Sequence, residues 1–162
     1  MINTKNELNN IATEINRLLS EYIEIHNEVF KFSWRKIIPI PFIFKAIDFK
    51  GLQSKAGKIL ITLENSNELI AQLLTKVSSD QSCFAHFLSE YCLALIETVS
   101  IFEKMLFQLY LKSQNSGDYS LSEHNKLSKG YEEAVRKYYS MGNRLNELYS
   151  EFNQPQRQEG YQ

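Results

Sequence analysis

Apolar residues recur every three or four positions along four long segments of this chain. The segments cover residues 8–32, 52–77, 84–109 and 127–152. Such spacing places the apolar side chains on one face of an α-helix. Strict alternation of apolar and polar residues, which is typical of β-strands, does not extend over a useful length anywhere. The pattern therefore predicts four helices and an all-α fold.

Residues that commonly cap helices stand close to three of these segments. Ser and Thr followed three residues later by Glu form capping boxes, which mark helix starts. The candidate caps are Thr4 with Glu7, Ser79 or Asp80, and Ser120 with Glu123. We therefore expect these residues to begin the first, third and fourth helices.

The connections between the segments predict how the helices are arranged. The second and third connections are short, which favours antiparallel neighbours. Narrow, heptad-like stripes favour coiled-coil-like packing with a shallow left-handed crossing. We therefore predict an antiparallel four-helix bundle formed by residues 1–153 as a single domain. Residues 154–162 are polar and contain Pro155 and Gly160, so we expect a flexible C-terminal tail.

Composition narrows the class of protein. The chain has 162 residues, of which 43% are hydrophobic and 23% charged, as in ordinary globular domains. The net charge of −1 gives no overall basic character that would attract nucleic acid. The polar N-terminal residues lack the apolar core of a secretion signal. Cys83 and Cys92 would lie on opposite sides of one helix, unpaired, so we expect a cytoplasmic protein.

The third segment is apolar nearly all round its predicted helix. Twenty of the 29 residues from Cys83 to Leu111 are apolar, and Leu93, Ile101 and Phe107 lie off the main stripe. A helix of this kind is buried on more than one side. We expect the connector between the first two helices or another polypeptide chain to cover its remaining flank; the alternative is a wide core-facing stripe with a few scattered apolar residues exposed.

Catalytic and metal-binding patterns are weak. Cys83, His86 and Glu90 share one helix face, but a metal site would need a further ligand from elsewhere. The stretch Gly51–Lys58 resembles a phosphate-binding loop but has five residues between its glycines and Ile59 after the lysine, so it does not fit that motif. We therefore expect no cofactor and no catalytic role.

The connector "KIIPIPFIFKAIDFK", residues 36–50, combines apolar and basic residues unusually densely. It holds eight large apolar side chains, and the window 31–58 contains seven basic residues against the single acidic Asp48. Pro39 and Pro41 prevent one continuous helix. Pro41 can begin a short extra helix that Gly51 ends, and an extended edge strand is the alternative.

Burying this many apolar side chains would gain about 1.5–3 kcal/mol each, so the connector is not expected to stay in water. Three arrangements remain open: a plug inside the bundle, a protein partner or second copy, and a membrane surface contacted by residues 37–49. Nucleic acid ranks below these, because isoleucine does not stack on bases. We predict a non-enzymatic protein-interaction or assembly module. The interaction candidates are Trp34, Arg35, Lys36, Ile38, Ile40, Phe42, Phe44, Lys45, Phe49 and Lys50.

Overall fold

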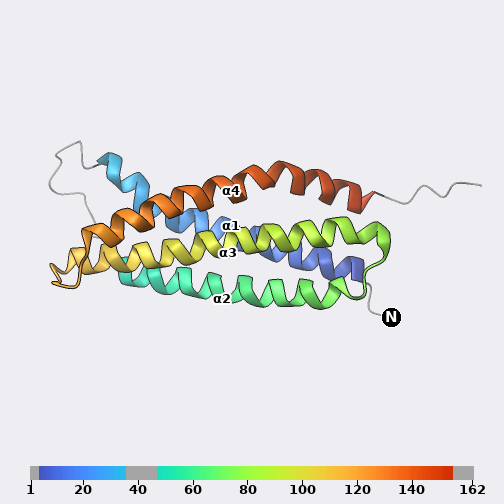
Figure 1. Ribbon diagram of the computed structural model, residues 1–162, viewed down its shortest axis with the longest axis horizontal. Helices are drawn as coiled ribbons and strands as arrows, with labels where there is room; N and C mark the ends of the chain where they lie inside the picture. Colours follow the sequence, from blue (N-terminus) through green and yellow to red (C-terminus); the bar gives the residue numbers. More distant parts are fainter. Residues whose placement is uncertain (1–3, 36–46, 155–162) are drawn as a thin grey trace, which may run out of the picture.

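The computed structural model describes residues 4–35 and 47–154 (Figure 1). Four helices account for nearly all of them: α1 (Thr4–Arg35), α2 (Phe49–Leu74), α3 (Ser79–Ser113) and α4 (Leu121–Asn153). Within these two ranges no residue belongs to a β-strand. The predicted all-α four-helix fold is therefore confirmed.

The predicted apolar stripes form the core. Every stripe residue of α1 from Leu8 to Val29 and every one of α2 from Leu52 to Leu73 is buried. Ser66 is the polar member of the α2 stripe, and its hydroxyl donates to the Thr62 carbonyl at 2.9 Å. The stripe is therefore uninterrupted, because the serine hydroxyl is satisfied within its own helix.

Helix α3 is the centre of the bundle. Helices α2 and α4 pack along it, and α1 lies against α2 and α3 (Figure 1). Leu95, Val99 and Phe102 are consequently 0% exposed. Most of the apolar surface of α3 is thus covered within the chain, although Leu93 and Phe107 remain 51% and 42% exposed.

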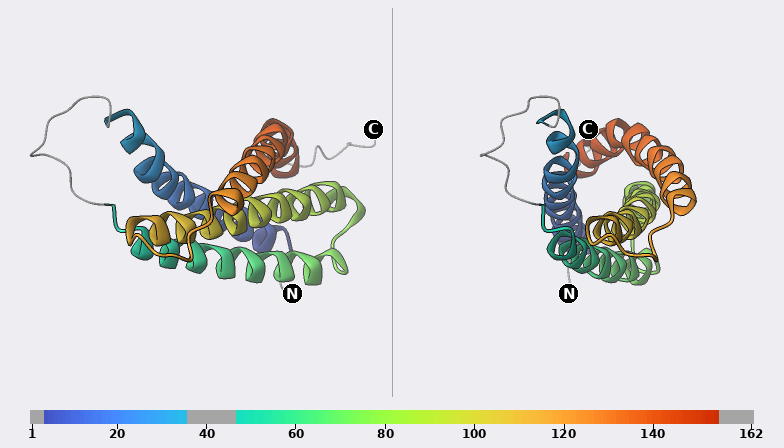
Figure 2. Two further views of the ribbon diagram at one scale, coloured as in Figure 1. Left: turned by 60° about the vertical axis from the view of Figure 1, so that its left-hand side comes forward. Right: turned by 90° about the vertical axis from the view of Figure 1, so that its left-hand side faces the viewer.

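Helices α1 and α4 are inclined in opposite directions above the α2–α3 pair (Figure 2). No Cα atom of α1 lies within 8 Å of a Cα atom of α4 in the described ranges. Closely packed helices have axes about 8–10 Å apart, so some of their Cα atoms come closer to each other than 8 Å. Close backbone packing is therefore not found between these two helices in the described ranges.

The start of α3 differs from the sequence prediction, whereas Ser120 caps α4 as predicted. Helix α3 begins one residue earlier than expected, with Ser78 as its N-cap, so the prediction of Ser79 or Asp80 was wrong. At α4, the Ser120 hydroxyl accepts from the Glu123 amide at 3.2 Å, as a capping box requires. The Ser120 amide, however, donates to the Gln108 side chain of α3, so the second half of that box is replaced by a contact between helices. Thr4 is the first described residue of α1.

Helix α2 begins at an aspartate cap that requires a glycine beside it. The Asp48 carboxylate accepts a hydrogen bond from the Gly51 amide at 2.9 Å. A Cβ atom on Gly51 would lie 2.2 Å from Asp48 Oδ2. Gly51 therefore lies inside the first turn of α2. Our prediction that Gly51 ends a preceding short helix was wrong. The proposed short helix from Pro41 lies outside the described residues.

This cap leads to a prediction for two glycines of α2. Gly57→Ala should raise the free energy of unfolding by about 0.5–1 kcal/mol, because its Cβ meets no atom within 4 Å and alanine favours helix. Gly51→Ala should give no such gain, because the new methyl group displaces the Asp48 cap, which is worth about 1 kcal/mol. Urea unfolding measures both. Equal stabilisation by the two substitutions would contradict this account of the cap.

Candidate functional site

The structure describes only part of the interaction surface predicted from sequence. Phe49 is half-buried and packs against the core, whereas Lys50 is exposed. Trp34 and Arg35 end α1, but their side chains are outside the described part of the chain. The remaining candidates, Lys36, Ile38, Ile40, Phe42, Phe44 and Lys45, also lie outside the described residues. These candidates are therefore not brought together as one site in the part of the chain that is described.

Part of the predicted basic cluster faces acidic residues of the same molecule. Lys55 and Lys58 of α2 line a crevice of about 490 Å³ together with Glu21, Glu24 and Glu28 of α1. Opposite charges that face one another across two helices attract, although water and salt weaken the attraction. Part of the basic cluster of the sequence therefore lies beside acidic residues of α1 at the junction of the two helices.

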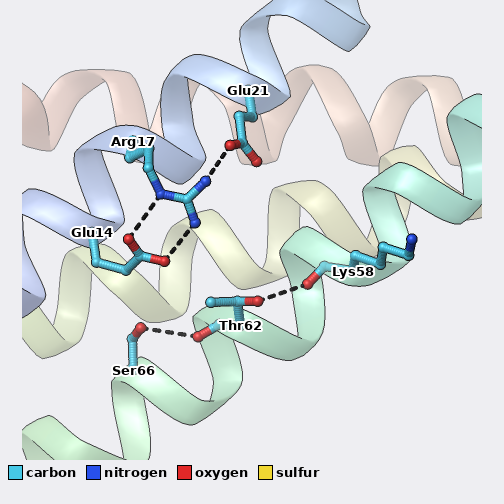
Figure 3. Close-up of polar contacts among 6 residues, drawn as sticks. All are labelled: Glu14, Arg17, Glu21, Lys58, Thr62 and Ser66. Atoms are coloured by element: carbon cyan, nitrogen blue, oxygen red, sulfur yellow. Dashed lines mark hydrogen bonds and ion pairs between the residues drawn. The ribbon is translucent and has the colours of Figure 1, made fainter.

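A network on α1 borders this crevice (Figure 3). The Arg17 guanidinium forms ion pairs with Glu14 and Glu21, one helical turn away on either side. The hydrogen bond from Arg17 lowers the pKa of the Glu14 carboxyl below its usual value. On the facing helix the Thr62 hydroxyl donates to the Lys58 carbonyl at 3.0 Å. Arg17 is thus engaged within its own helix.

Tyrosine side chains connect α1 to α4. The hydroxyls of Tyr22 in α1 and Tyr131 in α4 hydrogen-bond to each other inside the protein. The ring of Phe102, from α3, stacks on Tyr131 at 5.3 Å and meets Tyr22 edge-on at 5.6 Å. Tyr138 contacts Tyr22 edge-on at 6.3 Å. We call Tyr22, Tyr131 and Tyr138 the tyrosine bridge.

Burial keeps the hydroxyls of this region protonated. It raises the pKa of Tyr22, Tyr131 and Tyr138 above the ordinary value for tyrosine, and it raises the pKa of the nearby Tyr91 to about 12. A neutral phenol can donate as well as accept a hydrogen bond, whereas a buried phenolate would carry an unpaired charge. The bridge is therefore a neutral hydrogen-bonded contact over the whole physiological pH range.

A groove of about 630 Å³ lies between α1 and α4 on one side of the tyrosine bridge. Its floor comes from α3 through Phe84, Leu88 and Tyr91. The walls are Ala12, Thr13, Ile15, Asn16, Leu19 and Ile23 of α1, and Tyr138, Tyr139, Gly142, Asn143, Leu145, Asn146 and Tyr149 of α4. We call these residues the α1–α4 groove. None of them is charged, although charged residues make up 23% of the sequence.

Side-chain contacts lie toward both ends of the groove. Tyr22 and Tyr131 join the two helices at one end, and at the other Asn9 Nδ2 donates to Asn153 Oδ1 at 3.0 Å. The residues of α1 that line the groove, 12–23, cover about 16 Å of helix, or roughly three turns. The volume falls in the range of about 300–1,000 Å³ that is usual for ligand sites. The groove is thus elongated and bounded.

Large side chains stand exposed along the groove while its α4 wall contains a glycine. Tyr139 is 79% exposed, Ile23 41% and Tyr149 38%. Gly142 lies in the interior of α4, and a Cβ atom placed there would meet no atom within 4 Å. Gly142 therefore leaves open space beside α4. No contact in the described part of the chain requires a glycine at this position.

A second hollow, of about 480 Å³, lies on the other side of the bridge. His26 and Phe30 of α1 line it together with Tyr131, Glu132 and Arg136 of α4. Burial lowers the pKa of His26, whose ring packs at 4.6 Å from that of Phe30. This hollow contains side chains of both charge signs, whereas the residues of the α1–α4 groove are uncharged.

The candidate metal cluster does not form a site. Cys83, His86 and Glu90 are exposed on α3, and within the described ranges no three His, Cys, Asp or Glu side chains are placed to hold a metal ion. Cys83 and Cys92 are both free thiols, the former exposed and the latter buried, as their spacing predicted. Of the three histidines, His26 and His124 pack against aromatic rings and His86 is exposed.

Two further findings bear on function. Among the described helices, none is apolar enough over a sufficient length to cross a membrane. The chain matches no protein-family model, and neither the curated proteins nor the solved structures include a significant match. The function is therefore argued from the geometry of the chain alone.

The α1–α4 groove was not anticipated from the sequence, but two signals for it were present. Tyr22, Tyr131 and Tyr138 all occupy core positions of their stripes, and a buried hydroxyl needs a partner. Gly142 stands next to the stripe residue Met141 inside a predicted helix, where glycine is unfavourable. Together they indicate a place where two helices are held apart.

Removing the bridging hydroxyls should destabilise the protein. Tyr131→Phe or Tyr22→Phe leaves the other hydroxyl buried with a lost partner, which costs about 1–2 kcal/mol. The double variant should cost less than the sum, since neither hydroxyl is then left over. Chemical denaturation with Tyr139→Phe as the exposed control measures this. Strict additivity of the two substitutions would contradict the bridge.

The raised pKa values predict sensitivity to high pH. Unfolded tyrosines ionise near pH 10, but Tyr22, Tyr91 and Tyr131 remain neutral there in the folded state. Their contribution to stability is thus complete below about pH 10 and declines as the pH rises further. Urea unfolding between about pH 9 and 11 should show a shallower decline for Tyr91→Phe than for the unmodified chain. Identical pH profiles would refute this.

Proposed function

We propose that this protein is a non-enzymatic protein-interaction module whose α1–α4 groove binds a helix of another polypeptide. The observation that carries the proposal is the uncharged, elongated groove, with Tyr91, Tyr138, Tyr139 and Tyr149 along it. Protein interfaces are depleted of charged residues at their centre and enriched in tyrosine. Tyrosine is also among the residues that contribute most binding energy at interfaces.

The shape of the groove favours a helix as the bound element. Helical partners lie lengthwise in apolar grooves and insert side chains spaced three and four residues apart. About three turns of α1 line this groove, which matches the length over which such anchors repeat. Ala12 and Gly142 on opposite walls leave room for a backbone to approach closely.

The groove is a better-supported surface than the connector. Binding of a membrane by residues 37–49 would require their apolar side chains to be free, yet Ile47 and Phe49 pack against the core. Two of the basic residues that would attract anionic lipid or nucleic acid, Lys55 and Lys58, line the crevice with the α1 glutamates. The described residues therefore favour a protein partner over either alternative.

Site-specific photocrosslinking tests the proposal. A benzophenone amino acid replacing Tyr139 should capture a defined protein in the cells that make this chain, whereas the same group replacing Leu121, which is 61% exposed but outside the groove, should not. Filling the groove with Gly142→Trp should abolish the adduct, because the new side chain occupies the space. The proposal fails if the adduct at position 139 survives Gly142→Trp, or if position 121 gives the same adduct.

A further inference from the structure

Two of the three histidines lie near the same end of the bundle. His26 belongs to the second half of α1 and His124 to the first turn of α4, and this end also contains the turn between α3 and α4 (Figure 1). His26 lines the second hollow, and so does Ser128, which follows His124 by one helical turn. His86, the third histidine, lies near the start of α3, toward the other end. Both half-buried histidines are therefore placed beside the hollow between α1 and α4.

Aromatic rings from three helices surround the imidazole of His26. Its ring centroid lies 4.6 Å from that of Phe30, 6.1 Å from that of Phe102 and 6.0 Å from that of Tyr131. The charged form of a side chain in such surroundings loses part of its hydration, which disfavours protonation. His26 therefore suits this position as a neutral ring.

No net charge faces His26 across the hollow. From α4 the charged residues that line it are Glu132 and Arg136, which carry opposite signs, and from α3 it is lined by the uncharged Met105. Burial lowers the pKa of His26, and a hydrogen bond with Asn27 offsets only part of this effect. The neighbours of the ring thus do not compensate for its burial.

A different contact disfavours protonation of His124. Its Nδ1 atom is buried and has no hydrogen-bond partner among the described residues. An imidazolium carries a proton on both nitrogens, so protonation would bury an N–H group without an acceptor. The ring of His124 lies 6.2 Å from that of Tyr119, and the Nζ atom of Lys112 in α3 lies 5.7 Å from the same tyrosine ring. Burial and the charge of Lys112 both lower the pKa of His124.

Helix α4 itself brings no countercharge to His124. The residues one turn before and after it are uncharged: Ser120, Leu121, Leu127 and Ser128. Glu123 precedes it directly, but adjacent residues on a helix do not face each other. Both histidines are therefore held neutral by the folded chain, for two separate reasons.

We propose that acidification opens this end of the bundle, because protonation of His26 and His124 separates the second half of α1 from the first turns of α4. The pair of α2 and α3, which pack closely along each other, stays intact. Histidine is the side chain whose charge changes most readily near neutral pH, and such changes operate other pH-sensitive switches. The switch concerns the second hollow and does not depend on a partner in the α1–α4 groove.

The pH window follows from the direction of the pKa changes. An unfolded histidine has a pKa of about 6.5, and both folded-state pKa values lie below the ordinary one. The open state consequently binds more protons, so stabilisation of the closed state is complete above about pH 7 and declines as the pH falls. Unfolded carboxylates titrate near about pH 4, so a change between about pH 7 and 5 reports mainly the histidines.

Hydrogen–deuterium exchange of the full chain, followed by mass spectrometry, tests the proposal. After correction for the intrinsic pH dependence of exchange, residues 22–30 and 121–128 should lose protection at least about threefold between about pH 7 and 5. Residues 91–102 of α3 should keep theirs. Unchanged protection at both ends of the pH range, or an equal loss in α3, would overturn the proposal.

Side chains that do not titrate identify the groups responsible. His26→Phe keeps an aromatic ring among its neighbours and His124→Asn keeps a short polar side chain, so the two together should remove most of the acid response. His86→Asn, at an exposed position of α3, should leave the response unchanged. A response that survives the double substitution contradicts the proposal.

A proton NMR titration of the unmodified chain decides the case if circular dichroism shows that the double variant does not fold. The imidazole signals of His26 and His124 should titrate at lower pH in the folded chain than in urea. Identical titration in the two states overturns the proposal.

Discussion

The hydrogen bond between the hydroxyls of Tyr22 and Tyr131 joins α1 to α4 inside the protein. It joins the helices through two phenol side chains rather than through backbones packed side by side. Phe102 of the central helix α3 packs on both rings and so fixes them from below. The space on either side of the bridge is hollow, and the α1–α4 groove is the hollow without charged residues.

The periodicity of apolar residues predicted the helices and the core well, because burial of a helix face leaves a direct trace in the sequence. Of the third stripe, all residues from Phe84 to Leu106 are buried, as expected. The separation of α1 from α4 could not be predicted in this way. It depends on which long side chains meet across helices distant in sequence, here Tyr22 and Tyr131, and spacing within one helix does not encode that. The error of one residue at Ser78 has a similar origin, since three adjacent polar residues can all serve as caps.

Part of the segregated charge has a place inside the bundle. The basic residues Lys55 and Lys58 line one crevice with glutamates of α1, so a pattern that suggested external anionic partners also brings opposite charges near one another within one chain. By contrast, the groove proposed to bind a partner is distinguished by having no charge at all. An uncharged surface produces no signal in a count of charged residues, which is why the candidate residues chosen from sequence clustered elsewhere.

The account depends most on the α1–α4 groove being open in the isolated chain. The alkylation rate of a thiol at position 142 measures this directly, using Gly142→Cys with Cys83→Ser; burial raises the pKa of the remaining Cys92 to about 12 and keeps it unreactive. In dilute protein the rate should match that of the exposed control Ser122→Cys. A thiol at position 142 that is strongly protected even in dilute, monomeric protein would mean that α1 and α4 close on each other, and it would contradict the account.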